Sequence, residues 1–214
     1  MMKKFELTAE SKINWFGRTL YRIKACIDFT TASGDEVKAG DLGGYVEKEE
    51  NLSHDGKAWV WDDAKVCGNA KVCGDAKVWG NAEVCGDAKV WGNAKVCGDA
   101  KVWGNAKVCG DAEVCGNAVV WGNAKVCGDA KVWGNAKVWG NAEVCGNAVV
   151  WGNAEGAISL AKKHIDLTPE KSFKDCPFCG GKAELDEDSE VVICTECGST
   201  AKKTIWNNRK SQQP

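Results

Sequence analysis

The sequence predicts a mostly β protein whose central part is a parallel β-solenoid. A valine falls at every sixth residue from Val60 to Val150, sixteen times without a slip. An alanine lies two positions before each valine, and from Val66 onward Gly-Asn or Gly-Asp follows two positions after it. A short fixed period of this kind is typical of proteins whose units stack on one another. Because no insertion interrupts the period, we expect a scaffold or a binding surface rather than a catalytic pocket.

Alternation within each unit predicts which side chains lie inside. In an extended stretch such as Ala-Lys-Val-Trp, alternate side chains point to opposite faces. Alanine and valine must share the interior, because the other phase would bury a column of lysines. The Lys or Glu before each valine and the Cys or Trp after it then point outward. Gly-Asn or Gly-Asp forms the corner, where a positive φ suits Gly and Asn.

The spacing resembles the hexapeptide repeat of left-handed parallel β-helix proteins. Their aliphatic residue, with a small residue two positions earlier, matches Ala64 and Val66 and every later unit. The resemblance implies a left-handed winding with three hexads in each coil of 18 residues, and about five coils spaced about 4.8 Å apart. In that family a Gly often follows the aliphatic residue directly, whereas here Cys or Trp does. A different β-solenoid therefore stays an alternative.

A coil of three hexads predicts three outward columns of Cys and Trp, which we call faces A, B and C. Face A carries Trp61, Trp79, Cys97, Cys115, Trp133 and Trp151; face B carries Cys67, Cys85, Trp103, Trp121 and Trp139; face C carries Cys73, Trp91, Cys109, Cys127 and Cys145. We expect the stacked cysteines to stay thiols, because a Cβ separation near the coil spacing exceeds the usual 3.5–4.5 Å or so of a disulfide. Soft-metal binding by Cys109, Cys127 and Cys145 is an alternative.

Face B carries the candidate interface. Val119 replaces the outward Lys next to Trp121, and Trp103 and Trp139 flank them. Contiguous exposed apolar patches usually mark interfaces. Hexapeptide-repeat proteins are often trimers packed side by side, so the resemblance implies a homo-oligomer through this face, with a trimer favoured. Two alternatives are that the tryptophans only shield the coil, or that they stack on nucleic-acid bases, which the net charge of −2 does not favour.

The repeat is flanked by two other regions. An open solenoid end exposes unpaired backbone, so the first region is expected to be a β-rich cap with irregular first rungs. Within it, alternation over Leu20–Ile27 predicts a strand, and Gly34-Asp35 predicts a turn. The expected organisation is a cap over residues 1–55, the repeat over residues 56–156, a linker over residues 157–172 and a second module over residues 173–210.

The second module contains two Cys-x2-Cys pairs, which predict a structural zinc site. Two intervening residues let both thiolates face one ion, and four thiolates form a closed tetrahedral site. So short a segment cannot bury enough core to fold unaided, whereas metal binding supplies on the order of 10–16 kcal/mol. The predicted ligands are Cys176, Cys179, Cys194 and Cys197.

This module resembles the Lar-type restriction-alleviation zinc ribbon. The resemblance rests on Cys-Pro-Phe-Cys-Gly-Gly from Cys176, on Val-Val-Ile before Cys194, and on the closing Trp-Asn-Asn-Arg from Trp206. It covers only the C-terminal module. Such proteins are encoded by phages and prophages, and their name implies relief of host restriction. The N-terminal Gly-Asp-Leu-Gly-Gly-Tyr-Val also resembles, more loosely, phage-encoded hexapeptide-repeat proteins.

Composition and motifs narrow the expected function. No apolar run approaches the roughly 18 residues of a membrane span, and the first residues lack the apolar run of a signal peptide. We therefore expect a protein of the bacterial cytoplasm. Acyl transfer usually needs a general base, most often His, and both His54 and His164 lie outside the regular hexads.

The expected function is therefore a non-catalytic, phage-encoded accessory protein. It would counter or modulate host restriction or defence by binding a host protein. A self-assembling structural scaffold is the alternative, and a hexapeptide-type acyltransferase is the least favoured one.

Overall fold

The computed structural model describes residues 3–156, 164–166, 183–186, 191–194 and 200–202. The chain divides into two compact units, Met1–Thr168 and Pro169–Pro214. The described residues form β-strands and one short 3-10 helix, η1 (Glu49–Asn51), and contain no α-helix. None of their helices has the length and apolarity that crossing a membrane requires. The prediction of a mostly β protein is confirmed.

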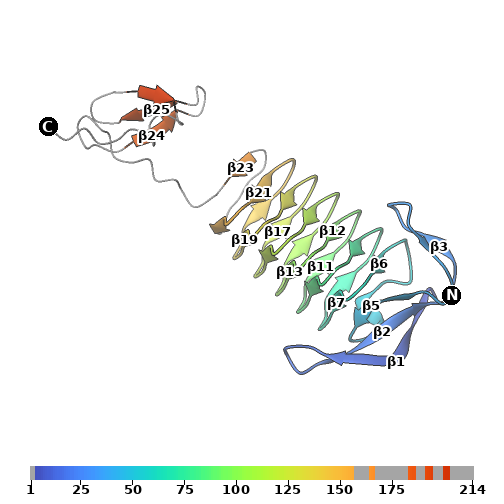
Figure 1. Cartoon of the computed structure of the whole chain (residues 1–214). Coiled ribbons are helices and arrows are strands. Elements are labelled where there is room, and N and C mark those ends of the chain that lie inside the picture. Colours follow the sequence, from blue (N-terminus) through green and yellow to red (C-terminus); the bar gives the residue numbers. More distant parts are fainter. Residues whose placement is uncertain (1–2, 157–163, 167–182, 187–190, 195–199, 203–214) are drawn as a thin grey trace. The chain divides into compact units, whose positions relative to one another are not determined.

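The first unit is a parallel β-solenoid, whose short strands stack into three sheets (Figure 1). Face B follows β5 (Leu42–Val46), β7 (Lys65–Val66), β10 (Glu83–Val84), β13 (Lys101–Val102), β16 (Val119–Val120), β19 (Lys137–Val138) and β22 (Glu155–Gly156). Face C follows β8 (Lys71–Val72), β11 (Lys89–Val90), β14 (Lys107–Val108), β17 (Lys125–Val126) and β20 (Glu143–Val144). Face A follows β6 (Trp59–Val60), β9 (Lys77–Val78), β12 (Lys95–Val96), β15 (Glu113–Val114), β18 (Lys131–Val132), β21 (Val149–Trp151) and β23 (His164–Asp166).

The register confirms the coil of three hexads. Val102 pairs with Val84 on one side and with Val120 on the other, so neighbouring strands are 18 residues apart. The strands of face B from β5 to β22 make about six turns. This is one more than the repeat alone predicts, because an irregular first coil precedes it: Val46 pairs with Val66, and Leu52 bridges to Val72.

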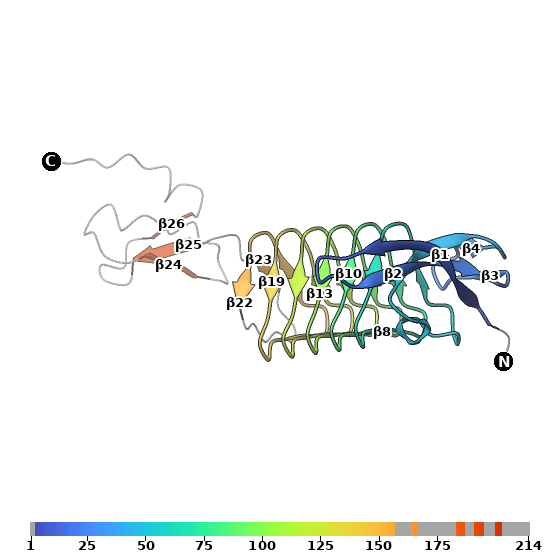
Figure 2. The same ribbon diagram turned by 90° about the horizontal axis from the view of Figure 1, so that it is seen from below.

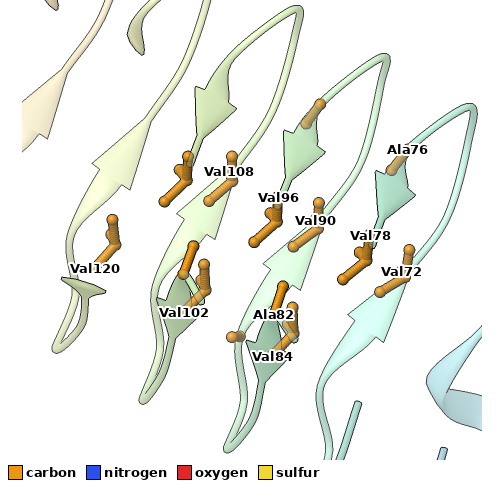
Figure 3. Close-up of a cluster of buried hydrophobic side chains, with 14 of the residues drawn as sticks. Val72, Ala76, Val78, Ala82, Val84, Val90, Val96, Val102, Val108 and Val120 are labelled. Carbon is orange, nitrogen blue, oxygen red and sulfur yellow. The ribbon is translucent and has the colours of Figure 1, made fainter. Parts of the chain in front are cut away.

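Valine and alanine fill the interior, as the alternation predicts (Figure 3). Every repeat valine from Val60 to Val150 is 0 % exposed, and the alanines from Ala58 to Ala154 are at most 1 % exposed. Burying each valine side chain stabilises the fold by roughly 1.5–3 kcal/mol relative to leaving it exposed to water. Backbone hydrogen bonds tie adjacent coils together along each sheet; the Trp103 amide, for example, donates to the Val120 carbonyl oxygen at 2.9 Å.

The corners require glycine. From Gly68 to Gly152 every corner glycine has a φ between 64° and 75°. Asp62 takes the same position in the one irregular hexad and is the only described non-glycine residue with a positive φ, at 52°. Asp tolerates this backbone region better than most residues.

The N-terminal segment extends the sheet of face B beyond its first strand. β1 (Phe5–Ile13) pairs antiparallel with β2 (Thr19–Ala25), and β2 pairs antiparallel with β5. The predicted turn at Gly34-Asp35 joins β3 (Phe29–Thr30) to β4 (Glu36–Val37). Trp59 occupies an outward position but is fully buried, because the rings of Phe5 and Phe29 lie against it at 6.4 and 5.4 Å. The edge of the face B sheet is thus extended by β1 and β2.

In the second unit, three described strands form an antiparallel sheet. They are β24 (Ala183–Asp186), β25 (Val191–Cys194) and β26 (Thr200–Lys202). The predicted ligand Cys194 ends β25, and Cys176, Cys179 and Cys197 lie outside the described residues. The zinc site therefore stays a prediction, as does the handedness of the solenoid.

Candidate functional surface

Face B brings the four predicted interface residues into one strip. β13, β16 and β19 are consecutive in its sheet, and Trp103, Trp121 and Trp139 directly follow them. The rings of Trp121 and Trp139 stack, with centroids 5.0 Å apart. Val119 pairs with Lys101 and Lys137 on the neighbouring strands. All four side chains are partly exposed, so the strip is both apolar and accessible.

The hairpin of β1 and β2 reaches over the same face (Figure 2). Its loop is closed by Asn14, whose Oδ1 accepts from the amides of Phe16 and Arg18 at 3.0 Å each. The Phe16 ring meets the Trp103 ring edge-on, with centroids 6.0 Å apart. Arg18 donates twice to the Glu47 carboxylate, at 3.0 and 2.9 Å. These contacts fix the hairpin tip against the solenoid.

The hairpin tip adds three exposed apolar side chains that sequence reasoning missed. Ile13 is 75 % exposed, Trp15 91 % and Phe16 59 %. The available signal was the composition of the loop, since a turn between two strands is normally polar. We define the apolar surface of face B as Ile13, Trp15, Phe16, Trp103, Val119, Trp121 and Trp139.

Three disulfides join adjacent coils, one on each face. They are Cys67–Cys85 on face B, Cys97–Cys115 on face A and Cys127–Cys145 on face C. The prediction that stacked cysteines stay thiols is wrong for these six residues. Their paired Cα atoms lie 4.6–4.7 Å apart, inside the usual disulfide range of about 4.4–6.8 Å. The coil spacing fixes the distance between the Cα atoms, whereas the paired side chains converge from them to form the bond.

Cys26, Cys73 and Cys109 are free thiols. Among the described residues, no group of three or more His, Cys, Asp or Glu side chains is placed to hold a metal ion. Soft-metal binding by Cys109, Cys127 and Cys145 therefore finds no support, since two of the three are joined in a disulfide.

Face A holds a charged groove of about 550 Å³. The Nζ atoms of Lys95 and Lys131 lie 3.1 and 3.7 Å from the Glu113 carboxylate. The Nζ atom of Lys77 lies 2.6 Å from Oδ2 of Asp35. Hydrogen bonds from Lys77, Ser33 and Thr31 hold the pKa of the Asp35 carboxyl well below its usual range. Lys77, Lys95 and Lys131 of this groove thus all have acidic partners, which does not favour the capture of an anion.

His54 has a structural position in the N-terminal cap. Its ring stacks on Phe5 with centroids 4.3 Å apart, and its Nδ1 accepts from the Lys4 amide at 3.2 Å. His164 lies in β23, which extends face A within the segment that the sequence assigned to the linker.

Compared with known proteins, the chain matches no family model and no curated sequence. The resemblances to hexapeptide-repeat and Lar-type proteins therefore rest on the motifs alone.

Proposed function

We propose that this chain is a non-catalytic binding protein that acts through protein–protein contact. The solenoid serves as the rigid support, and the apolar surface of face B is the contact surface. The observation that carries the proposal is the pair of aromatic contacts on face B, Phe16 with Trp103 and Trp121 with Trp139, together with a hairpin tip whose side chains are 59–91 % exposed. Soluble proteins rarely expose large contiguous apolar patches without a partner, and aromatic residues are enriched at interfaces.

The partner we propose for this surface is a second copy of the chain. The surface has two parts, the hairpin tip, where Trp15 is 91 % exposed, and the stacked pair of Trp121 and Trp139. The tip of one copy can cover the stacked pair of the next, in a two-fold dimer or in a closed ring. The resemblance to hexapeptide-repeat proteins favours a trimeric ring.

Face C fits this role less well than face B. Lys71, Lys89, Lys107 and Lys125 pair in register on adjacent strands of face C. A ladder of like charges opposes the approach of an identical face, because desolvating it is unfavourable.

The test replaces Trp121 by lysine and measures the mass in solution by light scattering. The matched control is Trp133→Lys, the same change at the equivalent position on face A, where Trp133 is 50 % exposed. We expect the wild type and Trp133→Lys to form the same oligomer and Trp121→Lys to be monomeric. A monomeric wild type, or an unchanged mass for Trp121→Lys, would refute self-association through face B.

The Lar-type resemblance extends the proposal to a role in the host cell. We propose a phage-encoded accessory protein of the bacterial cytoplasm that counters or modulates host restriction. The support is the motif in residues 173–210, and the proposed structural cofactor is Zn²⁺ held by Cys176, Cys179, Cys194 and Cys197. Elemental analysis should find one zinc per chain, and the double variant Cys176→Ser/Cys179→Ser should lose it.

A pulldown from a bacterial lysate separates this role from a purely structural one. The baits are the full chain and a variant that lacks residues 173–214. Recovery of restriction–modification subunits by the full chain alone supports the host-directed role. Recovery of only further copies of the chain by both baits supports the alternative, a self-assembling scaffold.

A further inference from the structure

Face C carries cysteines on three consecutive coils, in two oxidation states. Cys127 and Cys145 form a disulfide, and Cys109 is a free thiol. The three residues directly follow β14, β17 and β20, which are neighbours in one sheet. We propose that this column is a thiol–disulfide exchange site, in which the disulfide moves between Cys127–Cys145 and Cys109–Cys127.

Cys127 has the same backbone relation to both of its neighbours. Val126 pairs with Val108 on one side and with Val144 on the other. The Cys109 amide donates to the Val126 carbonyl oxygen at 2.9 Å, and the Cys127 amide donates to the Val144 carbonyl oxygen at 2.8 Å. A Cys109–Cys127 bond therefore needs no backbone arrangement beyond the one that the chain already uses for its three disulfides.

The exchange step balances within the column. The Cys109 thiolate attacks the Sγ atom of Cys127, so that the Cys109–Cys127 bond forms and the Cys127–Cys145 bond breaks. Cys145 leaves as a thiolate and takes up from solvent the proton that Cys109 released. The step consumes no oxidant and no reductant. Substitution at sulfur prefers the attacking, central and leaving atoms in a line, and residues stacked along the solenoid axis approximate one.

The environment of Cys109 determines how much of its thiol is ionised, and so affects the rate at which it attacks. Burial raises the pKa of the Cys109 thiol, and the nearby charges of Lys125 and Lys107 oppose that shift. The thiolate is the attacking species, so exchange at neutral pH is expected over the minutes to hours that are typical of uncatalysed disulfide rearrangement.

The other two faces supply matched controls. In the column of face A, Trp79 and Trp133 flank the Cys97–Cys115 disulfide. On face B, Trp103 follows the Cys67–Cys85 disulfide. Neither column has a third cysteine, so neither disulfide has a second partner. On face C itself, Trp91 separates Cys73 from Cys109.

The first experiment counts free thiols after equilibration of the full chain in one glutathione redox buffer. In Cys145→Ser, the proposal predicts that Cys127 pairs with Cys109, so the count falls by one relative to the wild type. In the control Cys115→Ser, Cys97 loses its partner and the count rises by one. The cysteines of residues 173–210 are common to all samples and cancel in the differences. A rise by one in Cys145→Ser would overturn the proposal.

The second experiment uses N-ethylmaleimide over several hours to trap the one free thiol among Cys109, Cys127 and Cys145 in the native wild type. Trypsin places Cys109 in the peptide of residues 108–125 and Cys145 in the peptide of residues 138–162. We expect the label on both Cys109 and Cys145, at a total of about one per chain, with Cys127 protected because it is bonded in both states. A label confined to Cys109 would contradict exchange.

Discussion

Gly104 shows the two reasons why a corner favours glycine, namely a positive φ and the close approach of the next coil. Its φ is +66°, and an added Cβ would lie 3.1 Å from the amide nitrogen of Gly122 in the next coil. Gly34, in the β3–β4 turn, has a φ of +88° with nothing within 4 Å of such a Cβ. Gly34→Ala should therefore lower the free energy of unfolding by the backbone cost alone, about 1–2 kcal/mol. Gly104→Ala should lower it further. Urea denaturation measures both, and equal losses would mean that the close stacking costs nothing.

Asn51 is a polar residue of the core whose hydrogen bonds require an amide side chain. It is fully buried, its amide donates to the carbonyl oxygens of Gly68 and Ala70 at 3.1 and 2.9 Å, and its Oδ1 accepts from the Lys48 amide. Asn51→Asp turns the donor into a charged acceptor that faces two carbonyl oxygens. We expect a loss of about 3 kcal/mol or more in the free energy of unfolding at neutral pH.

The loss in Asn51→Asp should shrink in acid, where a protonated carboxyl is neutral and can donate one hydrogen bond. The control is Asn153→Asp, because the exposed Asn153 only accepts from Asn135, at 3.0 Å. Its free energy of unfolding should change by less than about 0.5 kcal/mol. If the two variants have the same free energy of unfolding at neutral pH, the core does not require the amide side chain of Asn51.

The buried Lys4 makes the free energy of unfolding depend on pH in the alkaline range. It is 2 % exposed, and its ammonium donates to the Ala58 carbonyl oxygen at 2.9 Å. Burial lowers its pKa from 10.5 to about 8. Between these values the unfolded chain holds a proton that the folded chain has released, so the free energy of unfolding rises with pH, by on the order of 3 kcal/mol. Lys4→Met should lack this rise in urea denaturation. Parallel curves for both proteins between pH 8 and 10.5 would contradict the assignment.

At the scale of elements, the repeat strands were predictable and the hairpin tip was not. Each repeat strand needs only its own Ala-x-Val alternation, and the 18-residue register follows from three equal hexads. β1 instead has a register shift between Leu7 and Ser11 where it pairs with β2. The position of the tip depends on tertiary contacts, namely those of Phe16 with Trp103 and of Arg18 with Glu47. No local pattern encodes such contacts.

Two adjacent residues of the hairpin tip should separate folding from binding. The Phe16 ring lies against Trp103, whereas Trp15 is 91 % exposed. Phe16→Ala should cost about 0.5–1.5 kcal/mol for the lost aromatic pair and should speed hydrogen exchange in β1 and β2. Trp15→Ala should leave the free energy of unfolding unchanged and weaken self-association. The reverse assignment of the two effects would show that the tip is held by something other than Phe16.

At the scale of the whole molecule, the period determines which residues share a face but not how they bond. The columns of Cys and Trp could be listed from the sequence, because residues 18 apart stack. The disulfides could not be predicted, because the period gives the spacing of the coils and not the directions in which stacked cysteine side chains point. The zinc ligands depend on spacing alone, and their test lies in the metal content of the protein.

The backbone takes the same conformation in every regular hexad, so whole hexads can be deleted without changing the fold. Such a deletion changes which side chains share a face. Deleting residues 112–117 removes one hexad, so every later side chain moves to the next face. Trp121 and Trp139 then leave the face that carries Trp103 and the hairpin tip. Deleting residues 112–129 removes one whole coil, Trp121 included. It brings Trp139 next to Trp103 on face B, since these two residues are two coils apart.

Both deletions should therefore give similar β-rich circular dichroism spectra, because the inward Ala and Val pattern continues without a break. Only the deletion of a whole coil should keep an oligomer, because Trp103 and Trp139 then form a pair of neighbouring tryptophans beside the hairpin tip on face B. Light scattering measures the mass of each variant. The shorter deletion is the more informative one, since it removes fewer residues yet should lose more association. If both variants keep the wild-type oligomer, association does not depend on having the hairpin tip and two neighbouring tryptophans on one face.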